Sequence, residues 1–419
     1  MRRAGLVTAR LVTAIMVATA SMLSAGCASS TTDPAAELGK PVLPVKEATG
    51  EPIKVGFLNN DSGAFAVPEL RVGNEVGTDY LNTSLGGVNN RPLEVVRCGS
   101  DGSPEKSIDC ANKLVEAKVV AVLVGVDLGA DAALPILAAA KIPLVGHVQF
   151  GPKQMFDPNA YFFGAAALAY GAAALKFYAD QDVRSIRWFL PDVPTSHAFT
   201  DTVLTPISGK LGIDYRTVYY PAAAPNWSVL AATVAKDRPH VSGSIAGTDA
   251  QCASFVRALR GVGYRGRILA ASCAGLHKAI GAQAAGVDID LDHWNQGDPA
   301  SAPAAKQREI ASYVDAMAAA GRSKQAPGNA VITFADTLTL AKVLATVKSP
   351  VTGPSVAAAL RGTKGLDSFL GPQITCDHAW QGNSACSTGL LFYRYQRDGS
   401  LKAATANFLD ISQLAAGPA

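Results

Sequence analysis

Short apolar runs alternate with helical patterns from residue 52 onward, and this alternation limits the fold more than any other feature. The runs end in turn residues, as buried strands do, and lie at 53–59, 92–98, 119–125 and 142–148. One of the intervening helices is predicted to begin at Ser103 and Pro104, an N-cap residue followed by a first-turn proline. Strands that alternate with helices pair in parallel through right-handed crossovers. We therefore predict an α/β unit with a parallel sheet covered on both faces.

The same alternation restarts after a helical pattern near 168–181. The apolar runs of this second unit lie at 185–191, 213–220, 240–247 and 267–272. Helical stretches near 301–320, 329–346 and 353–361 then follow one another directly, and a strand pattern returns at 389–396. Two sheets in tandem predict two lobes. Ligands of open parallel sheets bind beyond the carboxyl ends of the strands, so we expect a cleft where the two sets of ends face each other.

The first 26 residues have the pattern of an export signal. Its basic residues are Arg2, Arg3 and Arg10. Residues 11–23 form an apolar segment too short to span a bilayer, and small residues lead from it to Cys27. The segment resembles a bacterial lipoprotein signal, in which the cysteine becomes the lipidated first residue and holds the protein at the outer face of the cell membrane. An ordinary secretory signal with an incidental Cys27 is the alternative. Residues 27–51 are expected to be a flexible tether.

The body of the protein carries no net charge. The formal charge of the whole chain is +3, and the three arginines of the export signal account for it. A neutral body has no electrostatic footprint for a polyanion. We therefore expect no nucleic-acid partner.

The chain has seven cysteines, which favours an exported, oxidising location. Apart from Cys27 they allow many connectivities, and pairing of sequence neighbours is the simplest hypothesis. That hypothesis gives the pairs Cys98–Cys110, Cys252–Cys273 and Cys376–Cys386. Zinc-finger spacing of cysteine and histidine does not occur, so no structural metal is expected.

Several segments, in a fixed order, carry a resemblance to a known family. They read "IKVGFLNNDSGAF", "GTDYLNTSLGGVNNRPLEVV", "SPEKSIDCANKLV", "AAAKIPLVG" and "VRALRGVGYRGRILAAS". Together they resemble the type I periplasmic solute-binding proteins of the branched-chain amino acid (Leu/Ile/Val-binding) uptake class, from about residue 52 onward. The resemblance implies two Rossmann-like lobes with parallel sheets and a hinge of three crossovers. It also implies a small-molecule ligand, an ABC permease and ATPase complex as partners, and no cofactor.

In that family the chain crosses between the lobes three times, so late helices return to the first lobe. The resemblance therefore places residues 52–165 and 297–365 in lobe one. Residues 166–296 and 366–419 would form lobe two and the hinge strands.

Motifs for catalysis and cofactor binding are weak in this chain. The fragment "GVGYRG" at 261–266 matches a dinucleotide-binding pattern, but it follows a predicted helix and precedes a strand, the reverse of the order that a pyrophosphate site needs. We interpret its glycines as a helix end and a turn. Patterns of zinc proteases, serine hydrolases and phosphate-binding loops do not occur, so we expect a protein that is not an enzyme.

An acidic run, "DIDLDHWN", contains alternating aspartates next to His293. Asp288, Asp290 and Asp292 would point the same way in a strand and could bind a hard cation. We favour the other interpretation, a face of the strand exposed to solvent.

The loops after the strands are the expected ligand contacts, because strand ends of one parallel sheet converge. The candidates in lobe one are Asp61, Ser62, Phe65, Asp127, Leu128, Gly129, Val148, Gln149 and Phe150. The candidates in lobe two are Asp192, His197, Thr248 and Asp249.

The chemistry of these loops departs from that of amino-acid-binding members, which hold the ligand carboxylate with hydroxyl groups after the third and fourth strands. Here these positions read Asp127, Leu128, Gly129 and Ala130, and then His147, Val148, Gln149 and Phe150. A desolvated carboxylate without donors is costly. We therefore expect a partly apolar or aromatic ligand, oriented by Asp127, Gln149, His197 and Thr248.

The main functional hypothesis is a lipid-anchored solute-binding protein that closes around its ligand and delivers it to an ABC importer. One alternative is a ligand sensor that reports to a membrane kinase. A secreted hydrolase is a weaker alternative, because it needs a nucleophile and a base within hydrogen-bond reach.

Overall fold

The computed structural model describes residues 43–63, 66–221, 225–245, 249–378 and 382–414. Cys27, Phe65 and Thr248, which the sequence analysis selected, lie outside these ranges. None of the helices built from the described residues is both long enough and apolar enough to cross a membrane.

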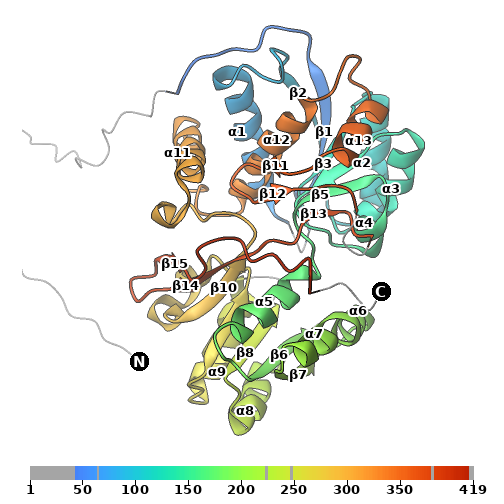
Figure 1. Cartoon of the computed structure of the whole chain (residues 1–419). Coiled ribbons are helices and arrows are strands. Elements are labelled where there is room, and N and C mark those ends of the chain that lie inside the picture. The colour runs from blue at the N-terminus through green and yellow to red at the C-terminus, as the bar shows by residue number, and fades with distance from the viewer. Residues whose placement is uncertain (1–42, 64–65, 222–224, 246–248, 379–381, 415–419) are drawn as a thin grey trace, which may run out of the picture. The chain divides into compact units, whose positions relative to one another are not determined.

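In the described residues the first sheet is parallel throughout, and its strands lie in the order β13-β5-β4-β3-β1-β2 (Figure 1). Its strands are β1 (Ile53–Asn60), β2 (Leu93–Ser100), β3 (Val122–Val124), β4 (Leu144–Gly146), β5 (Ala160–Ala165) and β13 (Ala385–Ser387). Helices on both faces belong to the same lobe: α1 (Pro68–Ser84), α2 (Pro104–Glu116), α3 (Ala130–Ala139), α4 (Pro152–Phe156), α11 (Ala304–Ala319), α12 (Ala330–Leu344) and α13 (Gly353–Arg361). The predicted parallel α/β unit is confirmed.

The second sheet has the order β15-β14-β10-β9-β8-β6-β7 in the described residues. Its strands are β6 (Ser185–Pro191), β7 (Asp214–Tyr220), β8 (Val241–Ile245), β9 (Arg267–Ala271), β10 (Val287–Leu291), β14 (Leu391–Tyr395) and β15 (Leu401–Ala403). The strands β6 to β10 pair in parallel, whereas β14 and β15 add an antiparallel edge. The helices of this lobe are α5 (Ala169–Ala179), α6 (Pro194–Phe199), α7 (Thr205–Lys210), α8 (Trp227–Asp237), α9 (Asp249–Gly261) and α10 (Leu276–Ile280).

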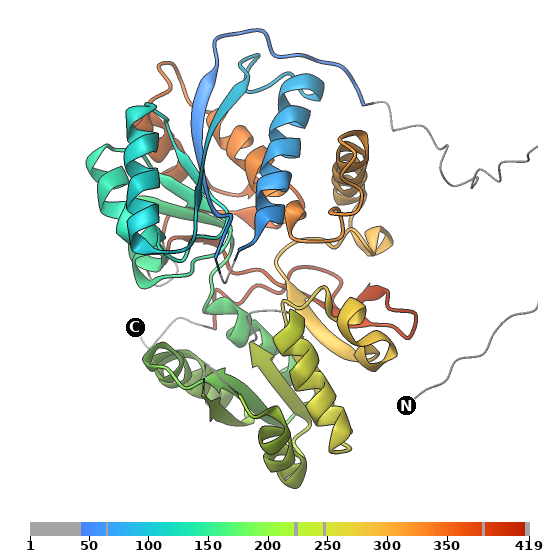
Figure 2. The same ribbon diagram turned by 180° about the vertical axis from the view of Figure 1, so that it is seen from behind.

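The described chain passes between the two sheets three times, at 166–168, 292–303 and 388–390. After the second crossing, α12 returns to the first lobe and packs along α1, although the two helices are far apart in the sequence (Figures 1 and 2). The Asn74 amide donates to the Thr337 hydroxyl across this contact (3.1 Å). Gly73 permits the close approach, because a Cβ there would lie 2.0 Å from the Ala330 carbonyl oxygen. The predicted three-crossover architecture is therefore present.

The last strands divide between the two sheets. β13 pairs in parallel with β5 of the first sheet, and a short antiparallel pair, β11 (Leu366–Asp367) and β12 (Gln373–Ile374), precedes it. Residues 366–419 were expected to form lobe two and the hinge strands. The pairing of β13 differs from that assignment, because it places residues 385–387 with the first sheet.

Local signals in the sequence account for several element boundaries. Ser103 caps α2 by accepting from the Lys106 amide (3.4 Å), and Pro104 occupies the first turn. α9 ends at Gly261, Gly263 turns the chain with φ = 72°, and β9 begins at Arg267. The glycines of "GVGYRG" therefore end a helix and form a turn, as predicted.

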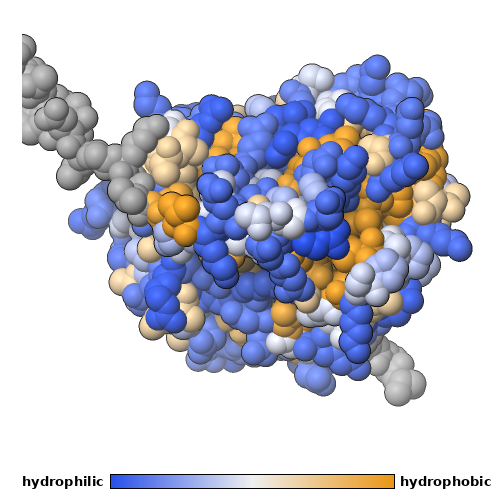
Figure 3. Space-filling view, turned by 90° about the horizontal axis from the view of Figure 1, so that it is seen from above, coloured by the Kyte–Doolittle hydropathy of each residue, from blue (hydrophilic) through white to orange (hydrophobic). Residues whose placement is uncertain are grey.

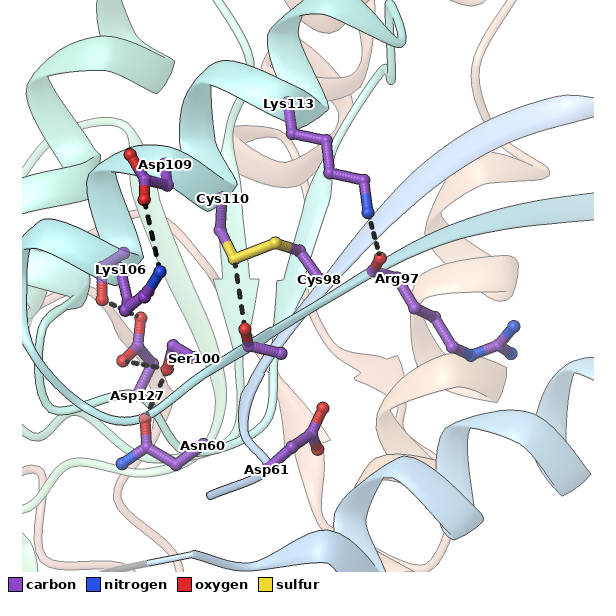
Figure 4. Close-up of a disulfide and its surroundings, with 12 residues drawn as sticks. Asn60, Asp61, Arg97, Cys98, Ser100, Lys106, Asp109, Cys110, Lys113 and Asp127 are labelled. Carbon is purple, nitrogen blue, oxygen red and sulfur yellow. Dashed lines mark hydrogen bonds and ion pairs between the residues drawn. A yellow bond between two sulfur atoms is a disulfide. The ribbon is translucent and has the colours of Figure 1, made fainter. Parts of the chain in front are cut away.

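The six described cysteines form the three predicted pairs. The Cα–Cα distances are 5.5 Å for Cys98–Cys110, 6.5 Å for Cys252–Cys273 and 4.2 Å for Cys376–Cys386. Figure 4 shows how the first pair joins edge strand β2 to α2, which lies over it. On the surface, hydrophilic side chains cover much of the face shown in Figure 3, with apolar patches between them, as is usual for a protein in water.

The interpretation of the aspartate run as a solvent-exposed face was wrong. Asp288, Asp290 and Asp292 are all buried. The reason is that β10 is an interior strand, between β9 and β14, and α5 supplies tyrosine hydroxyls to these carboxylates.

Each of these aspartates has its own partners. Asp288 accepts from Tyr178 (3.0 Å) and is paired with Arg267 (2.8 Å) and Arg394 (2.7 Å). Asp290 accepts from the Ser272 amide (2.7 Å), and burial raises its pKa to about 7. Asp292 takes part in the contact described next.

Candidate functional site

The carboxyl edges of the two sheets meet at one side-chain contact. His147 directly follows β4 of the first sheet, and Asp292 directly follows β10 of the second. His147 Nε2 and Asp292 Oδ1 lie 2.9 Å apart. Because β10 runs parallel to β9, this contact joins the edge of each sheet at which ligands of such folds bind.

Further bonds hold both residues in place. His147 Nδ1 lies 3.0 Å from Oδ1 of Asp336, a residue of α12. The second oxygen of Asp292 accepts from the Ala165 amide, at the end of β5, and from the Tyr170 hydroxyl on α5, both at 3.0 Å. Asp292 therefore fixes the first and the second crossing of the chain to each other as well as to His147.

The pairing decides the charge of these groups. Burial alone would lower the pKa of His147, but Asp292 and Asp336 outweigh it and hold that pKa well above its usual value. Burial would raise the pKa of Asp292, whereas His147 holds it well below the usual range. The pairing therefore favours the protonated form of His147 and the ionised form of Asp292.

The loop after β1 is held by neighbours within the first lobe. Asp61 accepts from the Asn59 amide (2.9 Å) and forms an ion pair with Arg71. The exposed Ser62 reaches the Ser100 carbonyl (3.4 Å). Asp61, which its partners hold in place, and the exposed Ser62 are thus neighbours at the carboxyl edge of the first sheet.

The loop after β3 is braced by the buried Asp127. Its oxygens accept from the hydroxyl of Ser100 (3.0 Å; Figure 4). They also accept from the hydroxyl of Ser107 (2.6 Å) and from the amide of Gly129 (3.2 Å). Burial raises the pKa of this carboxyl, and the hydrogen bonds oppose that rise. Both oxygens are engaged inside the lobe, so the structure gives Asp127 a bracing role in place of the expected ligand contact.

The loop after β4 is anchored by Gln149. Its amide nitrogen donates to Asn383 Oδ1 (2.9 Å) and lies 3.3 Å from the Ser384 hydroxyl, while its oxygen accepts from the Ala167 amide (3.2 Å). Gln149 is buried and thus ties this loop to the first crossing and to the segment before β13. The role expected for it, a free hydrogen-bonding group for the ligand, does not fit these contacts.

Two apolar side chains of the same edge remain open to solvent. Leu128, after β3, is 42% exposed, and Phe150, after β4, is 46% exposed. Val148, in the loop after β4, is partly buried, and Gly129 is buried where α3 begins. Leu128 and Phe150 are therefore the groups of lobe one that an incoming ligand could cover.

In lobe two, the loop after β6 presents a stacked pair of rings. His197 of α6 lies over Tyr219 of β7, with ring centroids 4.0 Å apart, and its Nε2 lies 2.8 Å from Asp192 Oδ1. Asp249, the first residue of α9, is exposed and accepts from the Gly275 amide (3.2 Å). Because β6, β8 and β9 are parallel neighbours, these loops lie at one edge of the second sheet.

Sequence reasoning missed Asp292, Asp336 and Tyr170 as part of this site. For His147, the sequence indicated only that a residue without a hydroxyl group follows the fourth strand. The usable signal was the aspartate run itself, because carboxylates in an interior strand need cationic or donor partners from elsewhere in the chain.

Comparison with known proteins decides the family. A family model described as "periplasmic binding protein" matches residues 52–395. The chain belongs to the periplasmic binding protein family. Members of this family are extracytoplasmic proteins that bind small solutes and work with ABC transporters. No curated protein matches the sequence.

Solved structures of this periplasmic binding protein fold resemble the chain over most of its length. The leucine-binding protein LivK of Thermotoga maritima has 15% identity and a TM-score of 0.68, over 86% of this chain and 99% of that one. The branched-chain amino acid binding protein LivJ of Streptococcus pneumoniae, in complex with isoleucine, has 15% identity and a TM-score of 0.65, over 86% and 100%. A fatty acid transporter substrate-binding protein of Thermomonospora curvata has 14% identity and a TM-score of 0.68, over 89% and 96%. At such identities the likeness concerns the fold.

We predict that Gln149→Leu lowers the free energy of unfolding by about 2 kcal/mol, because the substitution removes the bond to the buried Asn383 and the acceptor of the Ala167 amide. Urea unfolding followed by circular dichroism measures the change. The matched control is Gln283→Leu at an exposed position, which should change stability by less than about 0.5 kcal/mol. Parental stability of the Gln149 variant would show that these bonds do not anchor the loop.

Proposed function

We propose that this protein is a lipid-anchored solute-binding protein that captures a small molecule between its lobes and delivers it to an ABC importer. The observation that carries the proposal is the His147–Asp292 contact, which brings the carboxyl edges of both sheets together. The loops at those edges are the binding surfaces of parallel α/β sheets. Membership of the periplasmic binding protein family supports the same function.

The mechanism that fits this arrangement is hinge closure. Short crossings at 166–168 and 388–390 join the lobes, and a ligand that touches both lobes stabilises the closed state over the open one. The ABC permease then distinguishes the closed, loaded protein from the open one. Transport in this scheme requires no chemical step on the solute.

The chemistry of the loops favours a solute with an apolar or aromatic part. Leu128 and Phe150 offer apolar surface in lobe one, and the His197–Tyr219 stack offers a flat ring surface in lobe two. Polar contacts can come from Ser62, Asp192 and Asp249. The hydroxyl groups that amino-acid-binding members use after the third and fourth strands are replaced here, which argues against a standard α-amino acid.

The anchor is assigned to Cys27. The basic start, the short apolar segment and the small residues before the cysteine support lipidation at this position. A thiol at the start of a tether has no role in the fold of the described residues, whose own cysteines are paired with one another.

The ligand can be found with a thermal-shift screen of branched-chain and aromatic amino acids, aromatic acids, amides and fatty acids. A compound at 100 times its dissociation constant stabilises the folded state by about 2.7 kcal/mol. We predict that Leu128→Ala and Phe150→Ala each weaken binding of the best compound about 10- to 150-fold, because each loses about 1.5–3 kcal/mol of apolar burial. Isothermal calorimetry measures the affinities.

Exposed side chains of the same type provide matched controls near the opposite edge of the first sheet. Leu85, just after α1, is 41% exposed, and Phe156, shortly before β5 begins, is 51% exposed. Leu85→Ala and Phe156→Ala should bind as the parent does. The site assignment fails if all four variants bind equally well.

The anchor is tested in a bacterial host that processes lipoproteins. We predict that mass spectrometry of the mature N-terminal peptide identifies an acylated Cys27 and that Cys27→Ser releases the protein from the membrane fraction. An unmodified N-terminus, with the parent protein already soluble, would contradict the anchor and leave solute binding unaffected.

A further inference from the structure

A cluster of two histidines and two aspartates at the joint between the sheets has the composition of a metal site. The histidine–aspartate cluster consists of His147, Asp292, His293 and Asp336. One ligand atom each from His147, Asp292 and His293 lies within 4.8 Å of the others. Asp292 and His293 follow β10 directly, whereas His147 comes from the end of β4, so the donors converge from both sheets.

The spacing of the donor atoms fits one small ion. His147 Nε2 lies 2.9 Å and His293 Nδ1 lies 3.3 Å from the same Asp292 Oδ1. Tetrahedral ligands at about 2.0–2.1 Å from a zinc ion are about 3.3 Å from each other. Two of the three donor distances thus lie close to the spacing that tetrahedral ligands require, and the third is within 4.8 Å.

Outer contacts hold these donors as they do in known metal sites. Ligating histidines usually donate their other ring nitrogen to a carboxylate, which fixes the tautomer and the direction of the ring. His147 Nδ1 has this partner in Asp336 Oδ1 (3.0 Å). Asp292 Oδ2 is held by the Ala165 amide and the Tyr170 hydroxyl, which leaves Oδ1 directed at the two imidazoles.

An independent observation comes from the buried second oxygen of Asp336. Asp336 is buried, and its Oδ2 has no hydrogen-bond partner among the described residues. Asp336 lines a small cavity together with His147, Asp292 and His293. The cavity has a volume of about 10 Å³, which is room for one ion or one water molecule. A buried, unpartnered carboxylate oxygen is costly, and a water bound to the ion and lying in this cavity would satisfy it.

We propose that His147, Asp292 and His293 bind one divalent transition-metal ion and that Asp336 orients His147 for this task. Two imidazoles and one carboxylate form a donor set suited to Zn²⁺ and unsuited to Ca²⁺ or Mg²⁺, which prefer oxygen ligands. The ion takes the place of the proton on His147 Nε2, while the Nδ1 proton stays with Asp336. Bound there, it fastens the first lobe to the second crossing. This site goes beyond solute capture, which does not require it.

The test uses the full-length protein, without a histidine tag, stripped with a chelator and purified in detergent. Calorimetric titration with Zn²⁺ should give one ion per chain, and Co²⁺ should give the intense visible absorption of a tetrahedral site. His147→Gln and His293→Gln should each weaken Zn²⁺ binding at least about 100-fold, and Asp336→Asn about 10- to 100-fold. The control is His240→Gln, an exposed histidine that accepts from the Arg184 amide, which should bind as the parent does.

His293→Gln is the decisive variant, because His293 has one hydrogen-bond partner in the cluster, Asp292, beside its edge contact with the His147 ring. Its folding is checked by circular dichroism. Absence of stoichiometric Zn²⁺ binding in the parent would overturn the proposal and identify the cluster as a proton-bridged ion pair. Unchanged affinity in a folded His293→Gln protein would overturn it as well. Either result leaves the solute-binding proposal intact.

Discussion

The buried contact of His147 with Asp292 and Asp336 is the interaction on which the arrangement of the two sheets depends. Removal of these charges from water costs several kcal/mol for each ion, and the cost is recovered only when the partners meet with good geometry. His147 directly follows β4, Asp292 directly follows β10, and Asp336 lies in α12. Any displacement of one sheet from the other at this point would leave a charge buried without a partner, which is far more costly than loss of a surface ion pair.

This constraint explains how the polar groups of the loops are distributed. Asp127 and Gln149 hold their loops through internal bonds, and Asp292 holds two crossings of the chain. Under the proposed function, the loops would present a fixed edge to the solute, and such preorganisation lowers the entropic cost of binding. The exposed surface left for the solute is largely apolar in lobe one, at Leu128 and Phe150. Members of this family bind different solutes on one fold. Exchange of exposed side chains such as these can change which solute is bound without loss of the fold.

Much of the fold could be predicted from the sequence because its signals are local. The alternation of apolar runs and helical patterns gave both sheets, Ser103 and Pro104 marked a helix start, and the neighbouring cysteines paired as expected. The aspartate run was misinterpreted, and the internal contacts of Gln149 were not foreseen, because the environment of these residues depends on tertiary contacts. Nothing near Asp292 in the sequence indicates that His147 and Tyr170 will reach it, and Gln149 meets Asn383 only because β13 joins the first sheet. Polar residues in strands and strand-end loops are therefore the places where local patterns failed in this chain.

The most direct test of this account is a double-mutant cycle on the joint, with free energies of unfolding measured in urea for His147→Gln, Asp292→Asn and the double variant. The exposed pair His197 and Asp192 is the matched control, because its atoms lie 2.8 Å apart, against 2.9 Å in the joint. The account predicts a coupling energy of at least about 1.5 kcal/mol for the buried pair and less than about 1 kcal/mol for the exposed pair. A coupling energy near zero for His147 and Asp292, in variants that remain folded, would contradict the claim that this contact holds the two sheets together.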